Sequence, residues 1–135
     1  TGSRDVQIKP VLDAETLRNL QSLVRRIPVS KSLIAAAVKL VRMTRPGDPS
    51  APALVKEFVE WGAGPRASQY LVLGAKARAA LDGRPMADLE DVRAVAPAVM
   101  RHRVVANFAA EAADRSSEDI VLELIANRSW ESATG

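Results

Sequence analysis

One arginine at the start of a predicted helix is the feature of this sequence best suited to chemistry. The segment 61–67 reads Trp-Gly-Ala-Gly-Pro-Arg-Ala, so Arg66 follows two glycines and a proline. Gly62 and Gly64 allow close approach of the backbone to a ligand, and Pro65 suits the first position of a helix. The start of a helix also offers unpaired N–H groups and a positive dipole end, which attract anions. The pattern therefore predicts a phosphate contact through Arg66.

The same spacing has a plainer interpretation. Glycine and proline commonly occur just before a helix, and an arginine in the first turn can form an ion pair with a neighbouring carboxylate. Spacing alone favours this second interpretation, and other features of the sequence must decide between the two.

Other groups that could do chemistry are scarce. The chain has no cysteine and no G-x-x-x-x-G-K-[ST] phosphate-binding loop. Its single histidine, His102, has no second histidine with which to form a metal site or a proton relay. The acidic pairs Glu90–Asp91 and Glu118–Asp119 fall in the first turns of predicted helices, where they compensate the helix dipole. We therefore expect no metal site and no catalysis from this chain alone.

Length and composition indicate one globular domain. The chain has 135 residues, of which 47% are hydrophobic, and this is enough to form a core without disulfides or metals. No apolar run is long enough to span a bilayer, so we expect a soluble protein of the cytoplasm. Residues 1–3 resemble a cloning remnant, which indicates an excised fragment. We expect a helical domain over residues 4–128 and a disordered tail over 129–135.

The charge pattern argues against nucleic-acid binding as the main function. The formal net charge is +3, from 19 basic and 16 acidic residues interspersed along the chain. Nucleic-acid binders usually gather their basic residues on one face. A helical nucleic-acid module nevertheless stays open as an alternative, because Arg25–Arg26 and Arg101–Arg103 are short basic runs. A protein-interaction module unrelated to nucleotide is the third possibility.

Apolar spacing and capping residues predict the elements that position Arg66. Asp13 caps a first helix from Ala14 to Arg25 or Arg26, and Ser30 caps a second that stops near Thr44 or Arg45. The apolar stripe of that second helix consists of Ile34, Ala37, Val38 and Val41.

The rest of the chain predicts three further helices and no strand. Residues 46–52 are dense in turn-forming residues, and the form of residues 54–61, helical turn or extended, stays open. A helix over residues 65–82 stops at Gly83, and the next is capped by Asp88 and ended or bent by Pro97. A last helix starts at Ser116 or Ser117. The predicted fold is an all-α, small orthogonal bundle of about five helices.

Taken together, these motifs resemble a known family. The segments 61–68, 91–92, 101–103 and 107–108, in this order and spacing, make the sequence similar to the C-terminal lid of the MoxR family of AAA+ ATPases. The resemblance covers nearly the whole chain, from about Pro10 to the helix start at Ser117. The commonest family motif reads Gly-Ala-Ser-Pro-Arg-Ala, so Gly64 replaces the serine while Arg66 is kept.

The resemblance implies a role for the arginine. Arg66 would be the sensor 2 residue, which reaches the γ-phosphate of ATP bound by a preceding α/β subdomain. Gly62, Ala63, Gly64 and Pro65 would form the loop and helix start that present it. The Walker motifs would lie in that α/β subdomain, and the isolated lid is expected to bind no cofactor.

The resemblance also implies properties of the full-length parent. The parent would bind ATP and Mg²⁺, hydrolyse ATP and assemble as a ring of six subunits, as is common in the family. It would act as a chaperone-like remodeller of partner proteins, with von Willebrand factor A domain proteins among its possible partners.

Overall fold

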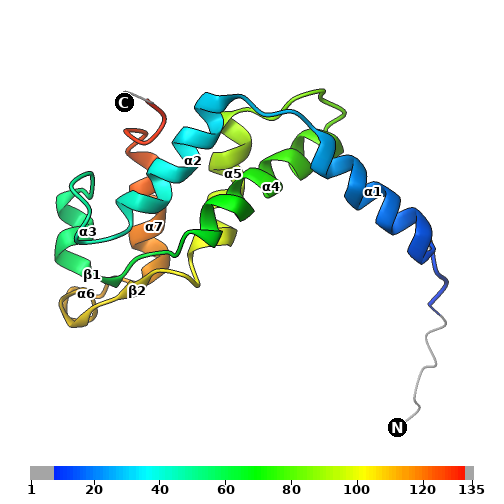
Figure 1. The fold of residues 1–135 in the computed structure, drawn as a ribbon. Coiled ribbons are helices and arrows are strands. Elements are labelled where there is room, and N and C mark those ends of the chain that lie inside the picture. The colour runs from blue at the N-terminus through cyan, green and yellow to red at the C-terminus, as the bar shows by residue number, and fades with distance from the viewer. Residues whose placement is uncertain (1–7, 133–135) are drawn as a thin grey trace, which may run out of the picture.

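The computed structural model describes residues 8–132, and within this range the chain forms helices and one small sheet (Figure 1). The predicted helical fold is confirmed, and the five predicted helices are present as α1, α2, α4, α5 and α7. The elements are α1 (Ala14–Arg26), α2 (Lys31–Met43), α3 (Ala53–Phe58), β1 (Val59–Trp61), α4 (Arg66–Leu81), α5 (Leu89–Met100), β2 (Val105–Ala106), α6 (Phe108–Ala112) and α7 (Ser117–Ala126). The predicted cloning remnant, residues 1–3, lies outside the described residues.

Capping side chains start the helices where the sequence predicts. Asp13 accepts a hydrogen bond from the Thr16 N–H at 2.7 Å, and Ser30 accepts one from the Leu33 N–H at 3.1 Å. Asp88 and Ser116 each form a capping box with the acidic residue three positions later. These bonds satisfy N–H groups that a helix start would otherwise leave unpaired.

The predicted stop of α4 at Gly83 is also confirmed. Gly83 has φ +67°, a left-handed conformation that glycine adopts without strain. The next N–H, that of Arg84, donates to the Ala79 carbonyl at 2.8 Å and completes a Schellman ending.

The core lies between α2, α4, α5 and α7. Helices α4 and α5 pack closely because Gly74 has no side chain, and a Cβ there would meet Val95 at 3.2 Å. The largest fully buried apolar side chains come from α2, α3, α4, α5, α7 and the segment after α7, and they include Leu33, Leu40, Val55, Leu71, Met100, Ile120, Leu124 and Trp130. The core is one contiguous cluster, so burial within this chain stabilises the fold that carries the site.

The pairing of two strands and the short helix α6 were not predicted, and residues 54–61, left open between a helical turn and an extended piece, contain both. Residues 53–61 form one short helix followed directly by β1, and β1 pairs antiparallel with β2 through Val59 opposite Ala106 and Trp61 opposite Val105. A strand of two or three residues has no periodicity of its own. Its pairing depends on contacts between segments far apart in the sequence, so local patterns could not reveal it.

One alternative for Pro97 and the predicted disordered tail were wrong. Pro97 does not end α5, which continues to Met100 and stays packed through the fully buried Ala96 and Met100. The predicted tail is ordered up to residue 132, because Trp130 is fully buried and its Nε1–H donates to the Ile125 carbonyl at 3.0 Å. Residues 133–135 lie outside the described range.

Helix α1 stands apart from the rest. It extends as an arm from the body of the domain (Figure 1), and none of its residues is buried. Its apolar stripe is therefore only partly covered, with Leu17, Leu20 and Leu23 about half exposed. No helix in residues 8–132 combines the length and apolar character needed to cross a membrane.

Candidate functional site

Arg66 is the first residue of α4 and its side chain is exposed. Pro65 precedes the helix by one position, with φ −57° and ψ −29°, so it is preset for the helical path. Within residues 8–132, Arg66 forms neither an ion pair nor a side-chain hydrogen bond. The interpretation in which Arg66 pairs with a neighbouring carboxylate is therefore wrong for the described chain, and its charge is available to a ligand.

The loop before Arg66 is held by the end of α2. The Ala63 N–H donates to Thr44 Oγ1 at 2.9 Å, and Arg45 Nε donates to the Ala63 carbonyl at 3.1 Å. Thr44 is itself buried, and its hydroxyl donates to the Val41 carbonyl at 2.6 Å. Both polar groups of the Ala63 backbone are thus fixed, which sets where α4 begins. Sequence reasoning placed Thr44 and Arg45 at the end of α2 but did not find this contact.

The two glycines of the loop have different roles. A Cβ on Gly62 would lie 2.5 Å from the Thr44 carbonyl oxygen and 2.7 Å from Arg45 Cγ, whereas a Cβ on Gly64 would meet nothing within 4 Å. Gly62 is therefore required for close approach to its own chain, and the expectation that it leaves room for a ligand does not describe its surroundings. Gly64 faces open space, which a small side chain such as serine could occupy.

This difference gives a paired prediction. Gly62→Ala should lower the free energy of unfolding by about 1–3 kcal/mol, because the methyl group collides with backbone atoms that cannot easily move. Gly64→Ala should change it by less than about 0.5 kcal/mol. Urea unfolding of this chain, followed by circular dichroism, measures both. Equal losses in the two variants would contradict the assigned packing.

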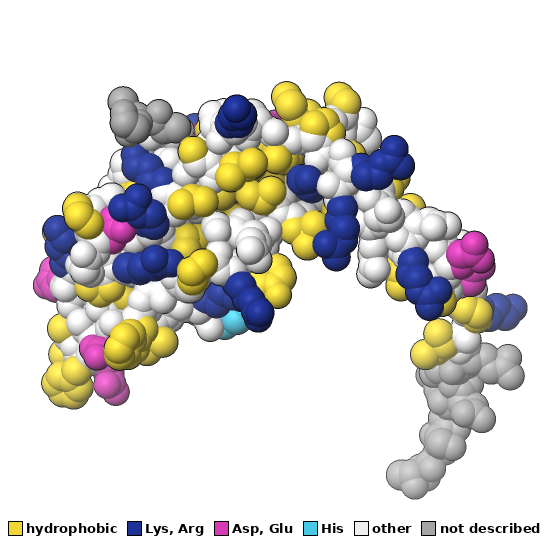
Figure 2. Space-filling view, in the orientation of Figure 1, with side chains coloured by type: hydrophobic (Ala, Val, Ile, Leu, Met, Phe, Trp, Pro, Cys, Tyr) yellow, Lys and Arg dark blue, Asp and Glu magenta, His cyan; other side chains and the backbone are white. Residues whose placement is uncertain are grey.

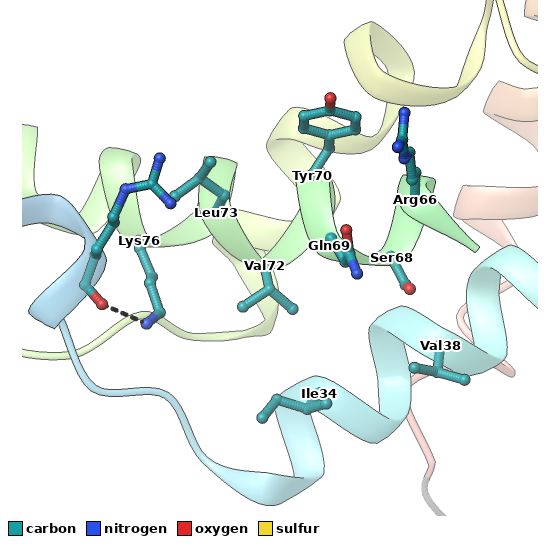
Figure 3. Close-up of a pocket in the computed structure, with 10 residues that line it drawn as sticks. Ile34, Val38, Arg66, Ser68, Gln69, Tyr70, Val72, Leu73 and Lys76 are labelled. Atoms are coloured by element: carbon teal, nitrogen blue, oxygen red, sulfur yellow. Dashed lines mark hydrogen bonds between the residues drawn. The ribbon is translucent and has the colours of Figure 1, made fainter. Parts of the chain in front are cut away.

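An open groove lies beside Arg66, between α2 and α4 (Figure 3). Its volume is about 620 Å³. Its apolar lining includes Ile34 and Val38, which are 43% and 41% exposed, so the predicted stripe of α2 is only partly buried. The cations lining it are Arg25, Arg66 and Lys76, and no carboxylate is among its lining residues. The groove is thus suited to a ligand with an apolar part and a negative charge.

Arg103, the last residue of the 101–103 run, lies on the side of α4 that carries Arg66. It follows the end of α5, and the Arg103 guanidinium carbon lies 5.0 Å from the centre of the Tyr70 ring. Figure 2 shows the single histidine of the chain next to Lys or Arg side chains on the same face.

The acidic pairs in the first helical turns are structural. Asp91 is buried and receives hydrogen bonds from Arg84, which hold the pKa of its carboxyl below the usual range despite burial. Asp119 caps α7 through Ser116, whose hydrogen bonds likewise lower the pKa of Asp119. In residues 8–132 no three His, Cys, Asp or Glu side chains are grouped to hold a metal ion.

Comparison with known families places these features in context. Residues 51–124, which include the loop and Arg66, match the model of the AAA lid domain family. The chain is 34% identical over 122 residues to Chaperone MoxR1 of Mycobacterium tuberculosis, covering 90% of this chain and 31% of that protein. It is 36% identical over 99 residues to Protein MoxR of Methylorubrum extorquens, covering 70% of this chain and 29% of that protein.

A solved structure has a similar fold. A candidate ATPase from Cytophaga hutchinsonii superposes with a TM-score of 0.73 at 28% sequence identity, covering 82% of this chain and 33% of that one. The chain thus spans about a third of the length of these relatives.

Proposed function

Since this chain belongs to the AAA lid domain family, as a lid of the MoxR type, we propose that it closes over ATP bound by an α/β subdomain of the same protein. Arg66 would bind the γ-phosphate, as the sensor 2 residue of the lid. The observation that carries this proposal is the free guanidinium at the start of α4, exposed and without a carboxylate partner in residues 8–132.

The surroundings of Arg66 support the proposal. Thr44 and Arg45 fix the loop, so the arginine is presented from a rigid position rather than from a mobile segment. The groove next to it offers apolar side chains and no carboxylate, a combination compatible with a nucleotide.

The arginine would couple nucleotide state to lid position. Bound ATP supplies a γ-phosphate, a charged group that ADP lacks. A charge-assisted hydrogen bond to that phosphate contributes about 1.5–3 kcal/mol, and it exists only when the lid is closed. Loss of the γ-phosphate removes this differential contact, and the lid is then free to open.

The remaining parts of the function belong to the whole protein. The α/β subdomain would hold ATP and Mg²⁺ and carry out hydrolysis, and the lid by itself would not be an enzyme. Movement of the lid would drive chaperone-like remodelling of partner proteins in a ring assembly, in the cytoplasm. A von Willebrand factor A domain protein is the class of partner we propose.

Hydrogen exchange of the whole protein tests the proposed closure. Amides of residues 62–68 should exchange more slowly with a non-hydrolysable ATP analogue than with ADP, because only the analogue offers a γ-phosphate to Arg66. The amides of residues 120–125, in the buried part of α7, serve as the internal control and should not differ. Equal exchange at residues 62–68 in the two nucleotides would contradict the proposal.

A further inference from the structure

Tyr70 connects Arg66 to a second arginine. Tyr70 follows Arg66 by one helical turn, and residues at this spacing lie on the same side of a helix. Figure 3 shows both side chains pointing the same way from α4. Arg103 stacks on the Tyr70 ring, with 5.0 Å between the guanidinium carbon and the ring centre. The segment after α5 therefore brings a second guanidinium to the side that carries Arg66.

The contacts of Arg103 fix its orientation and leave some of its hydrogen-bond donors free. Its Nη1 donates to the Val99 carbonyl and contacts the ring of His102, while the Tyr70 ring supports the guanidinium plane. A guanidinium has five N–H donors, and these bonds involve only one of its three nitrogens. Arg103 is thus oriented while retaining donors for a ligand.

Positive charge in this region exceeds negative charge. Arg101 lies 3.8 Å from Glu118, in a pair exposed on both sides. Neither Arg66 nor Arg103 has a carboxylate partner within residues 8–132. Two unpaired guanidinium groups on one side of a helix repel each other, and a ligand with several negative charges would relieve that repulsion.

We propose that Arg103 is a second phosphate-binding arginine of this lid, so that Arg66 and Arg103 bind different phosphate groups of one polyphosphate chain. This inference rests on the proposed function, in which Arg66 binds the γ-phosphate of a nucleotide. The fork of a guanidinium matches phosphate oxygens in a bidentate manner, and the Tyr70 stack orients that fork in advance. The ligand class is a chain of linked phosphates, because its successive phosphate groups can present oxygens to two guanidinium groups that come from different elements, α4 and the segment after α5.

Titration of this chain with inorganic phosphates tests the inference. Inorganic tripolyphosphate is added at low salt to the ¹⁵N-labelled chain, with orthophosphate in a parallel titration. Tripolyphosphate should shift the amide signals of residues 66, 70 and 101–103 with one common affinity, and orthophosphate should bind more weakly. Arg103→Ala should weaken tripolyphosphate binding about tenfold, as expected for a charge-assisted contact. Arg103→Lys keeps the charge but loses the paired N–H donors of the guanidinium. It should bind tripolyphosphate more tightly than Arg103→Ala and more weakly than the wild type.

Arg115 offers a matched control. It also stacks on an aromatic ring, that of Phe58 at 5.4 Å, so Arg115→Ala removes the same charge and the same kind of contact. The tripolyphosphate affinity of Arg115→Ala should stay within about twofold of the wild type, since Arg115 contacts Phe58 and not Tyr70. Tyr70→Phe keeps the ring and should also bind normally.

The outcomes separate this inference from the proposed function. Weaker binding in Arg66→Ala with unchanged binding in Arg103→Ala would overturn the inference and leave the role of Arg66 intact. Weaker binding in Arg103→Ala with unchanged binding in Arg66→Ala would also overturn the inference, because it requires both arginines. The role of Arg66 toward ATP is tested separately, by the nucleotide affinities of the whole protein. An equal loss in Arg103→Ala and Arg115→Ala would mean that only overall charge matters, and this too would overturn the inference.

Discussion

Replacing Arg66 with alanine in the whole protein is expected to lower ATP turnover by about ten- to a hundred-fold. The reason is the charge-assisted contact with the γ-phosphate, which is worth about 1.5–3 kcal/mol, where about 1.4 kcal/mol corresponds to a factor of ten. The fold should not suffer, because Arg66 is exposed and its side chain packs into no core. Steady-state ATP hydrolysis, with circular dichroism to confirm folding, measures the effect.

Two further variants make this result specific. Arg66→Lys keeps the charge but loses the bidentate fork, so it should recover only part of the turnover. Arg42→Ala removes the same charge from an exposed position on α2, where Arg42 pairs with Asp48, and should stay within about twofold of the wild type. If Arg66→Ala turns over ATP as fast as Arg42→Ala does, Arg66 has no role in ATP turnover.

The second large effect concerns the stability of the domain. Asp91→Asn should lower the free energy of unfolding by about 3 kcal/mol, because it removes the charge of a buried carboxylate that pairs with two partly exposed arginines. The Asp91 carboxylate is bonded by Arg84 through Nη1 at 2.8 Å and Nη2 at 2.5 Å, and by Arg78 Nε at 3.3 Å. It also accepts the Asp88 N–H at 2.9 Å and so closes the capping box of α5. Urea unfolding of this chain measures the loss.

Asp82 provides the matched control for Asp91. It bonds the same arginine, Arg84, at 3.0 Å, but its side chain is 50% exposed. Asp82→Asn should therefore cost less than about 1 kcal/mol, as for surface ion pairs. A similar loss of unfolding free energy in Asp82→Asn and Asp91→Asn would contradict the claim that burial makes the Asp91 ion pairs more stabilising.

The same carboxylate makes stability depend on pH. The pKa of Asp91 is lowered in the folded chain from its ordinary value of 3.8, chiefly by hydrogen bonds from Arg84. The unfolded chain therefore binds a proton to Asp91 at a higher pH than the folded chain does. The stability contributed by this carboxylate is fully present above about pH 5 and is lost as the pH falls through the lowered pKa. The loss between pH 5 and pH 2 should be smaller in Asp91→Asn than in the wild type.

Local signals in the sequence predicted the main helices well. Asp13, Ser30, Asp88 and Ser116 mark helix starts because their side chains bond the next turn, a contact that needs no distant partner. Gly83 marks a helix stop for a similar reason, since its left-handed conformation is a property of one residue. Features of this kind are determined within a few positions of the chain.

Features that depend on distant segments could not be predicted in the same way. The pairing of β1 with β2 joins parts of the chain far apart in sequence, and Trp130 is buried in a core that also draws on α2, α4 and α5. The role of Gly62 shows the same limit. Its spacing indicated room for a ligand, whereas the atoms that require a glycine there are those of Thr44 and Arg45.

The candidate site shows both situations. Helix punctuation and family resemblance singled out Arg66, and the structure adds that this arginine has no carboxylate partner within residues 8–132. The hydrogen bonds of Ala63 with Thr44 and Arg45, and the stacking of Arg103 on Tyr70, could be found only from the three-dimensional structure. A cation at a helix start is visible in sequence, but its freedom to bind a ligand depends on what the rest of the fold places beside it.

The affinities of the whole protein for a non-hydrolysable ATP analogue and for ADP test the central claim most directly. If Arg66 senses the γ-phosphate, Arg66→Ala should weaken binding of the analogue about tenfold or more and leave ADP binding within about twofold. Equal weakening of both nucleotides, or no weakening of the analogue, would contradict the claim that Arg66 is a γ-phosphate sensor.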